Sequence, residues 1–188
     1  MNYIEAWEHF NKSILSTLQE KNLENIKTYI FDNQDILFKE FWDKIISIRS
    51  NLNETYPKKI ICSYYISSMI QNQSEKPLFV ISANDSFNNV MTSASYDPSW
   101  LVDDWYALCQ EIRFESKKYF GKIGKVKLEQ VLLAILKEHI DLLERFLLDN
   151  ILIISRQEYT LDWLLIENFC IEFGGCYNKH QKIYIFEE

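Results

Sequence analysis

The feature that most restricts the fold of this chain is residues 126–149, a run without glycine or proline. Its apolar residues outnumber its polar ones and recur at helical spacing, and they include Leu132, Ile135, Leu143 and Phe146. This pattern predicts a long helix with a wide apolar face, which is typical of a helix that lies deep in a fold.

Other segments predict further helices around it. In residues 3–20, apolar side chains recur at spacings of three and four, which indicates one helix that ends at Lys21 and Asn22. A short helical stretch follows over residues 24–31. A new helix is expected to start at residues 32–35, where a carboxylate follows three residues after an aspartate cap, and to continue through residues 37–51.

Asp97 and Pro98 mark another helix start, because aspartate caps a helix and proline suits its first position. This helix is expected to end near Phe120, with Gly121 as the stop signal.

Strands are predicted at three places. Residues 60–66 and 78–81 are rich in β-branched and aromatic residues and are separated by a polar turn at 71–76. Residues 82–97 indicate a long polar loop with a short helix near 87–91, and residues 151–154 a short strand. A C-terminal hairpin is expected over residues 164–186, around Gly174 and Gly175.

Together these elements predict an α+β fold. It is a helix-dominated single domain over residues 1–188, with a small antiparallel sheet formed by hairpins near 58–82 and 164–186. The chain is 47% apolar and 15% aromatic, which excludes a disordered protein.

The charge excludes two further classes. There are 20 basic and 27 acidic residues, a net charge of −7, whereas general nucleic-acid binders and membrane-surface binders need a cationic surface. The N-terminus lacks the pattern of a signal peptide, and no apolar run approaches the roughly 20 residues of a spanning helix. We therefore expect a cytoplasmic protein without a membrane partner, whose four cysteines are thiols: Cys62, Cys109, Cys170 and Cys176.

Motifs for cofactors and metals are absent. The four glycines are not placed to build a phosphate-binding loop, so no nucleotide cofactor is expected. A two-residue turn at Gly174 and Gly175 would pair Phe173 with Cys176 and Cys170 with Lys179, which puts the two cysteines on opposite faces. With His180 they would give only three ligands, and we predict no metal site.

One segment is basic. Residues 98–125 carry five bases and four acids, with Arg113, Lys117 and Lys118 beside Tyr119 and Phe120. Charge next to aromatic rings suits a single-stranded nucleic acid. We favour the alternative that these cations stabilise the C-terminal end of a helix dipole.

The remaining functional signal is an acidic surface with aromatic residues. Tryptophan and tyrosine anchor protein interfaces because they bury a large area and keep a polar group, and carboxylates steer a basic partner. The residues that we predict to bind a partner are Asp85, Asp97, Trp100, Asp103 and Asp104, with Glu187 and Glu188 as a second acidic spot.

In overall character the chain resembles small bacterial immunity and antitoxin proteins, which are acidic, single-domain and poor in motifs. The resemblance implies a non-enzymatic protein that blocks the basic active site of a toxin domain, with carboxylates in place of substrate phosphates. Two alternatives stay open. One is an enzyme that uses His139 or His180 with nearby carboxylates, and the other is a structural or regulatory protein that binds through an apolar groove.

Overall fold

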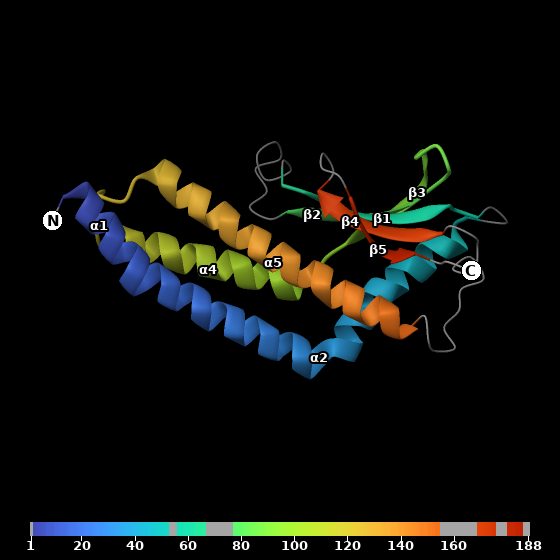
Figure 1. The fold of residues 1–188 in the computed structure, drawn as a ribbon, viewed down its shortest axis with the longest axis horizontal. Helices are drawn as coiled ribbons and strands as arrows, with labels where there is room; N and C mark the ends of the chain where they lie inside the picture. The colour runs from blue at the N-terminus through green and yellow to red at the C-terminus, as the bar shows by residue number, and fades with distance from the viewer. Residues whose placement is uncertain (1, 53–55, 67–76, 155–168, 176–179, 186–188) are drawn as a thin grey trace. The chain divides into compact units, whose positions relative to one another are not determined.

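The computed structural model describes residues 2–52, 56–66, 77–154, 169–175 and 180–185 (Figure 1). Contacts divide the chain into two compact units. The helical unit comprises Met1–Asn33 and Ser99–Leu143, and the sheet unit comprises Gln34–Pro98 and Glu144–Glu188. Long helices and one small sheet confirm the helix-dominated α+β class. That residues 1–188 form one domain stays a prediction.

The helical unit contains α1 (Tyr3–Phe10), a π-helical turn η1 (Asn11–Leu15), the first part of α2 (Ser16–Ser50), α4 (Ser99–Lys117) and the first part of α5 (Lys125–Ile154). A buried hydrogen bond joins two of these helices, since the indole Nε1 of Trp105 in α4 donates to the carbonyl of Leu132 in α5 at 3.2 Å. The long apolar helix predicted over residues 126–149 is confirmed. The break predicted at Lys21 and Asn22 is wrong, because α2 continues through both residues.

Helix α2 changes direction at Asn33, whose φ and ψ of −122° and 15° are not helical. The side-chain amide of Asn33 donates to the carbonyl of Tyr29 at 2.9 Å, which satisfies a helical acceptor at the kink. Two helical segments meet at this kink, so a helical segment begins near residues 32–35 as predicted, although it follows the preceding segment directly.

The sheet unit contains a five-stranded sheet in the order β3-β2-β1-β4-β5. The strands are β1 (Lys59–Tyr65), β2 (Leu78–Asn84), β3 (Val90–Tyr96), β4 (Cys170–Gly175) and β5 (Gln181–Ile185). Both predicted hairpins are present as antiparallel pairs, β1 with β2 and β4 with β5. They are joined by a parallel pairing of β1 with β4, so the sheet is mixed.

Two expectations about local structure are corrected. Residues 90–96 form strand β3 where a polar loop was expected, and residues 151–154 are the end of α5 and not a strand. Residues 90–96 pair with β2 despite their polar composition, and residues 151–154 continue the helix that precedes them. The predicted turn at 71–76 lies outside the described residues.

One face of the sheet is closed by aromatic side chains. Tyr96, Phe79, Tyr64 and Phe173 come from four neighbouring strands, and the successive ring centroids lie 6.5, 6.2 and 5.9 Å apart. Phe41 of α2 packs edge-on against Tyr96 at 5.4 Å. The second part of α2 therefore covers this face, and functional polar groups of the unit are left to the other face and to the turns.

Candidate functional site

The predicted partner-binding residues are distributed over both units. Asp85 and Asp97 belong to the sheet unit, whereas Trp100, Asp103 and Asp104 belong to the helical unit. Glu187 and Glu188 lie outside the described residues. Of these residues, Asp104 lines a groove in the helical unit, and this groove is the main candidate site.

A groove of about 190 Å³ lies between α2 and α4 of the helical unit. Each helix contributes four residues at the spacing i, i+3, i+4 and i+7, which marks one helix face. The lining residues are Leu18, Lys21, Asn22 and Asn25 from α2, and Asp104, Ala107, Leu108 and Glu111 from α4. The groove is thus part apolar and part polar, with two carboxylates and one ammonium group.

Asp104 is held at the groove by a polar cluster. The amide Nδ2 of Asn22 donates a hydrogen bond to Oδ2 of Asp104, and Nε2 of His139 lies 3.6 Å from the same oxygen. His139 is fully buried in α5, and its Nδ1 donates to the carbonyl of Ile135 at 2.9 Å, since a carbonyl can only accept. Within the described residues, Nε2 of His139 and Oδ1 of Asn22 are buried without a hydrogen-bond partner.

The neighbouring α4 residues present a second, aromatic element. Asp103 is exposed, and Trp100 is half-buried with its ring stacked on Tyr29 of α2 at a centroid distance of 6.5 Å. Trp105 of the same helix is buried. Acidic and aromatic side chains therefore occur along α4 as expected, although only Asp104 of the predicted set lines the groove.

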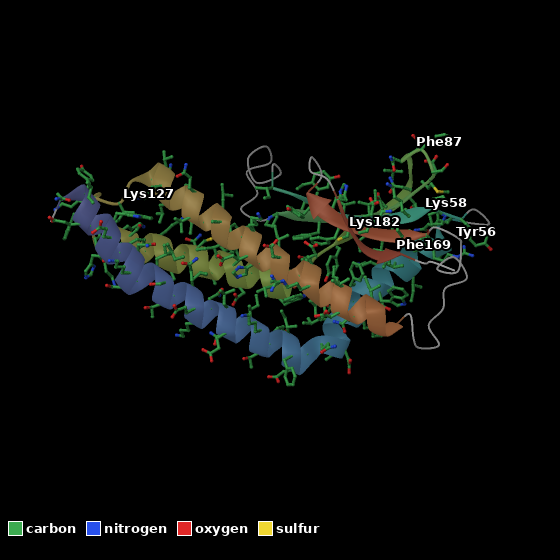
Figure 2. The ribbon with its side chains drawn as sticks, viewed as in Figure 1. Tyr56, Lys58, Phe87, Lys127, Phe169 and Lys182 are labelled. Atoms are coloured by element: carbon green, nitrogen blue, oxygen red, sulfur yellow. The ribbon has the colours of Figure 1, made fainter. Side chains whose placement is uncertain are left out.

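Asp85 organises the turn between β2 and β3. Its carboxylate accepts from the backbone amides of Phe87 and Asn89 at 2.8 and 2.9 Å, and from the side chain of Asn89 at 2.9 Å. These hydrogen bonds, led by that from the Asn89 side chain, lower the pKa of Asp85 below its ordinary value. The turn presents Phe87, which is 82% exposed (Figure 2). Asp97, at the end of β3, is exposed.

The other face of the sheet carries a second polar group. Nε2 of His180 lies 3.1 Å from Oγ of Ser63 on β1, and Nζ of Lys59 lies 3.4 Å from Oε2 of Glu172 on β4. Burial is the main cause that lowers the pKa of His180. The negative charge of Glu172 opposes this shift, and the positive charge of Lys59 adds to it. A serine next to a neutral histidine is one requirement of nucleophilic catalysis, but Ser63 is only 8% exposed.

The hairpin register predicted around Cys170 is wrong. Gly174 and Gly175 lie within β4, Phe173 pairs with Gln181, and Cys170 pairs with Ile185. The loop is longer than two residues because the glycines continue the strand. Cys176 lies outside the described residues, as do residues 177–179.

The described thiols are poor nucleophiles. Cys62, Cys109 and Cys170 are free and buried. Burial raises the pKa of all three, and that of Cys109 reaches about 12. A thiol reacts as the thiolate, so none of these groups is activated.

Of the eight groove residues, sequence reasoning predicted only Asp104, and it missed the polar residues Lys21, Asn22, Asn25 and Glu111. The signal was present, because Leu18, Lys21, Asn22 and Asn25 share one helical face, but a helix end had been placed at Lys21. In the described part of the chain, no three or more histidine, cysteine, aspartate or glutamate side chains gather to hold a metal ion. No helix among the described residues has the length and apolarity to cross a membrane.

Comparisons with protein-family models, with curated proteins and with solved structures found no match to this chain.

Proposed function

We propose that this chain is a non-enzymatic protein of immunity or antitoxin type, which binds a basic partner through the groove between α2 and α4. The main support is the groove, in which Asp104 and Glu111 share one face of α4. At about 190 Å³ it is smaller than the roughly 300–1,000 Å³ of pockets for drug-sized ligands, and suits a single long side chain.

The chemistry of the groove favours arginine as that side chain. Leu18, Ala107 and Leu108 offer apolar contact for its methylene stem, and the two carboxylates offer acceptors for its guanidinium group. Lys21 opposes the carboxylates and reduces the attraction.

The neighbouring residues fit a protein partner. Trp100 stacked on Tyr29 supplies a preorganised aromatic surface, and exposed Asp103 adds a charge that steers a basic partner during encounter. A toxin domain with a basic active site is the partner class that we propose. An enzymatic role of His139 has less support, because its side chain is fully buried and does not line the groove.

A defined peptide tests the groove without knowledge of the natural partner. An acetylated and amidated tetra-arginine peptide is titrated into the ¹⁵N-labelled full chain, and a matched tetra-glutamate peptide serves as the control. We expect shifts of the Ala107 and Leu108 amide signals with tetra-arginine only. Glu111→Gln should weaken binding by roughly 5-fold, as one lost charge-assisted contact predicts.

Two variants make the test specific. Glu138→Gln removes the same charge from an exposed position on α5 of the same unit, outside the groove, and should change affinity by less than 2-fold, whereas Lys21→Gln should strengthen binding. Equal effects of Glu138→Gln and Glu111→Gln, or equal shifts with tetra-glutamate, would contradict the groove as the binding site.

A further inference from the structure

One end of the helical unit exposes several large apolar side chains. Phe120, in the turn between α4 and α5, is 92% exposed, and Phe114 in the last turn of α4 and Val126 at the start of α5 are also exposed. Single exposed apolar residues are normal on protein surfaces, but a group of them at one place marks an interaction site.

The start of α1 lies at the same end of the unit. Oη of Tyr119 lies 2.7 Å from Nδ1 of His9. Nζ of Lys127, which is labelled in Figure 2, lies 4.1 Å from the ring centroid of Trp7. Tyr3 precedes Trp7 by one helical turn on the same helix face, and both Tyr3 and its neighbour Ile4 are exposed. Exposed apolar side chains from three helices therefore gather around this turn.

The same turn is the most basic part of the chain. Residues 113–127 contain six bases and one acid, a net charge of +5, whereas all other residues together carry −12. The net charge of −7, from which we expected no membrane partner, therefore conceals a local concentration of positive charge at this turn. We call the following residues the basic tip: Phe114, Lys117, Lys118, Phe120, Lys122, Lys125, Val126 and Lys127. Lys117 and Lys125 have exposed side chains, and Nζ of Lys118 lies over the ring of Phe114 at 5.3 Å.

The backbone of the turn exposes Phe120 in a conformation that is unfavourable for this residue type. Phe120 has φ = +51° and is followed by Gly121 with φ = +77°. A left-handed backbone conformation is unfavourable for a residue other than glycine, and it is rare for bulky side chains. Tyr119, the preceding residue, is buried. A strained backbone that exposes a phenylalanine next to lysines indicates a functional turn.

We propose that the basic tip binds the surface of an anionic lipid bilayer, with Phe120 and Val126 inserted at the boundary between headgroups and acyl chains. Lysines around an inserted apolar group are the pattern of peripheral membrane attachment, where each cation near an anionic surface contributes about 5-fold in binding. The aliphatic side chains of Ile4 and Val126 favour a bilayer over a nucleic acid, because they cannot stack on bases. This attachment is independent of the groove between α2 and α4.

Vesicle flotation with the full chain tests the proposal. Vesicles of 70% phosphatidylcholine and 30% phosphatidylserine should carry the protein, and vesicles of phosphatidylcholine alone should not. Lys117→Gln with Lys125→Gln should lower the partition coefficient by about 30-fold, at roughly 5-fold for each lysine. Phe120→Asn should lower it by roughly 10-fold, and asparagine tolerates the left-handed backbone.

Matched variants of the same unit serve as controls. Lys27→Gln with Lys137→Gln removes two exposed lysines elsewhere, and Phe31→Asn replaces a phenylalanine that is 80% exposed in α2. Both should float like the native chain, and circular dichroism melting checks that all variants are folded. Three results would overturn the proposal: no flotation with phosphatidylserine, equal loss in the control variants, or binding to a 30-nucleotide oligo-dT without binding to vesicles.

Discussion

The Cα of His180 lies 3.0 Å from the position that a Cβ on Gly174 would occupy, and the ring atoms Cδ2 and Cγ lie 3.1 and 3.5 Å from it. The histidine therefore passes over β4 at a residue that has no side chain, and so reaches Ser63 on β1. The polar contact across two strands depends on this glycine.

Gly174→Ala is expected to displace His180 from Ser63. Overpacking at a close contact costs about 1–3 kcal/mol in the free energy of unfolding, which urea denaturation measures. Ser63→Ala is the companion variant, since it removes the hydrogen bond at a cost of about 1 kcal/mol without adding volume. If Gly174→Ala were as stable as the native chain, the contact of His180 with Ser63 would not depend on the absence of a side chain at Gly174.

The stability of the protein should decrease on mild acidification because of His180. Its pKa in the folded state is lowered by burial, whereas in the unfolded chain it is about 6.5. As the pH falls below about 7, the unfolded chain binds the proton first, so the free energy of unfolding decreases until the folded pKa is passed. Native chain and His180→Gln are compared by urea denaturation between pH 7.5 and 5.

The His180→Gln variant isolates this effect, because His9 and His139 are retained in both proteins. We expect a flatter dependence of stability on pH in the variant. Identical pH dependence of the two proteins would show that His180 titrates alike in the folded and unfolded chains.

Asp85→Ala should loosen the turn that presents Phe87. The carboxylate accepts three hydrogen bonds there, and hydrogen exchange of the Asn89 amide should become faster without them. In the native chain the turn should be ordered above the ordinary aspartate pKa of about 3.9, and should lose its support as the pH falls through the lower folded pKa of Asp85.

An amide-proton titration by NMR follows this loss at Phe87 and Asn89. Asp97→Ala is the control, since that carboxylate is exposed in the same unit. Unchanged exchange at Asn89 in Asp85→Ala would mean that the backbone alone determines the turn.

Alkylation should distinguish the folded from the unfolded thiols. With a pKa of about 12, only about one Cys109 thiol in 10⁴ is ionised at pH 8. Complete burial also raises the pKa of the Cys62 thiol. We expect iodoacetamide to modify both cysteines slowly in the native chain and rapidly in 8 M urea, as followed by peptide mass spectrometry. Equal rates in the two states would contradict the burial of these thiols.

Local patterns in the sequence predict correctly those elements that neighbouring residues determine. Residues 126–149 are helical because their apolar face is long and uninterrupted, and α4 starts at Ser99, directly after Asp97 and Pro98. The two antiparallel hairpins were also identified, since each is formed by neighbouring segments.

Strand β3 and the parallel pairing of β1 with β4 could not be predicted in this way. Residues 90–96 carry small polar side chains that are typical of loops, and they form a strand because β2 offers an edge. The pairing of Lys59 with Cys170 depends on segments far apart in the chain, for which a single sequence carries no local signal.

The candidate site was predicted only in part, because its contacts also join segments that are far apart in the chain. Asp104 was identified from its neighbours on α4, but its contacts with Asn22 and His139 come from two other helices. Which polar residues surround a carboxylate follows from helix packing, and only the structure provides that.

The parallel pairing of β1 with β4 also determines the order in which the molecule can be completed during synthesis. The meander of β1, β2 and β3 leaves the ribosome early, but β1 keeps one side unpaired until Cys170 has been made. At about 5–20 residues per second this interval lasts roughly 5–20 s, long for an exposed strand edge. A nascent chain that stalls within this interval carries an open hydrogen-bonding edge, and it is at this stage that the protein is most exposed to aggregation.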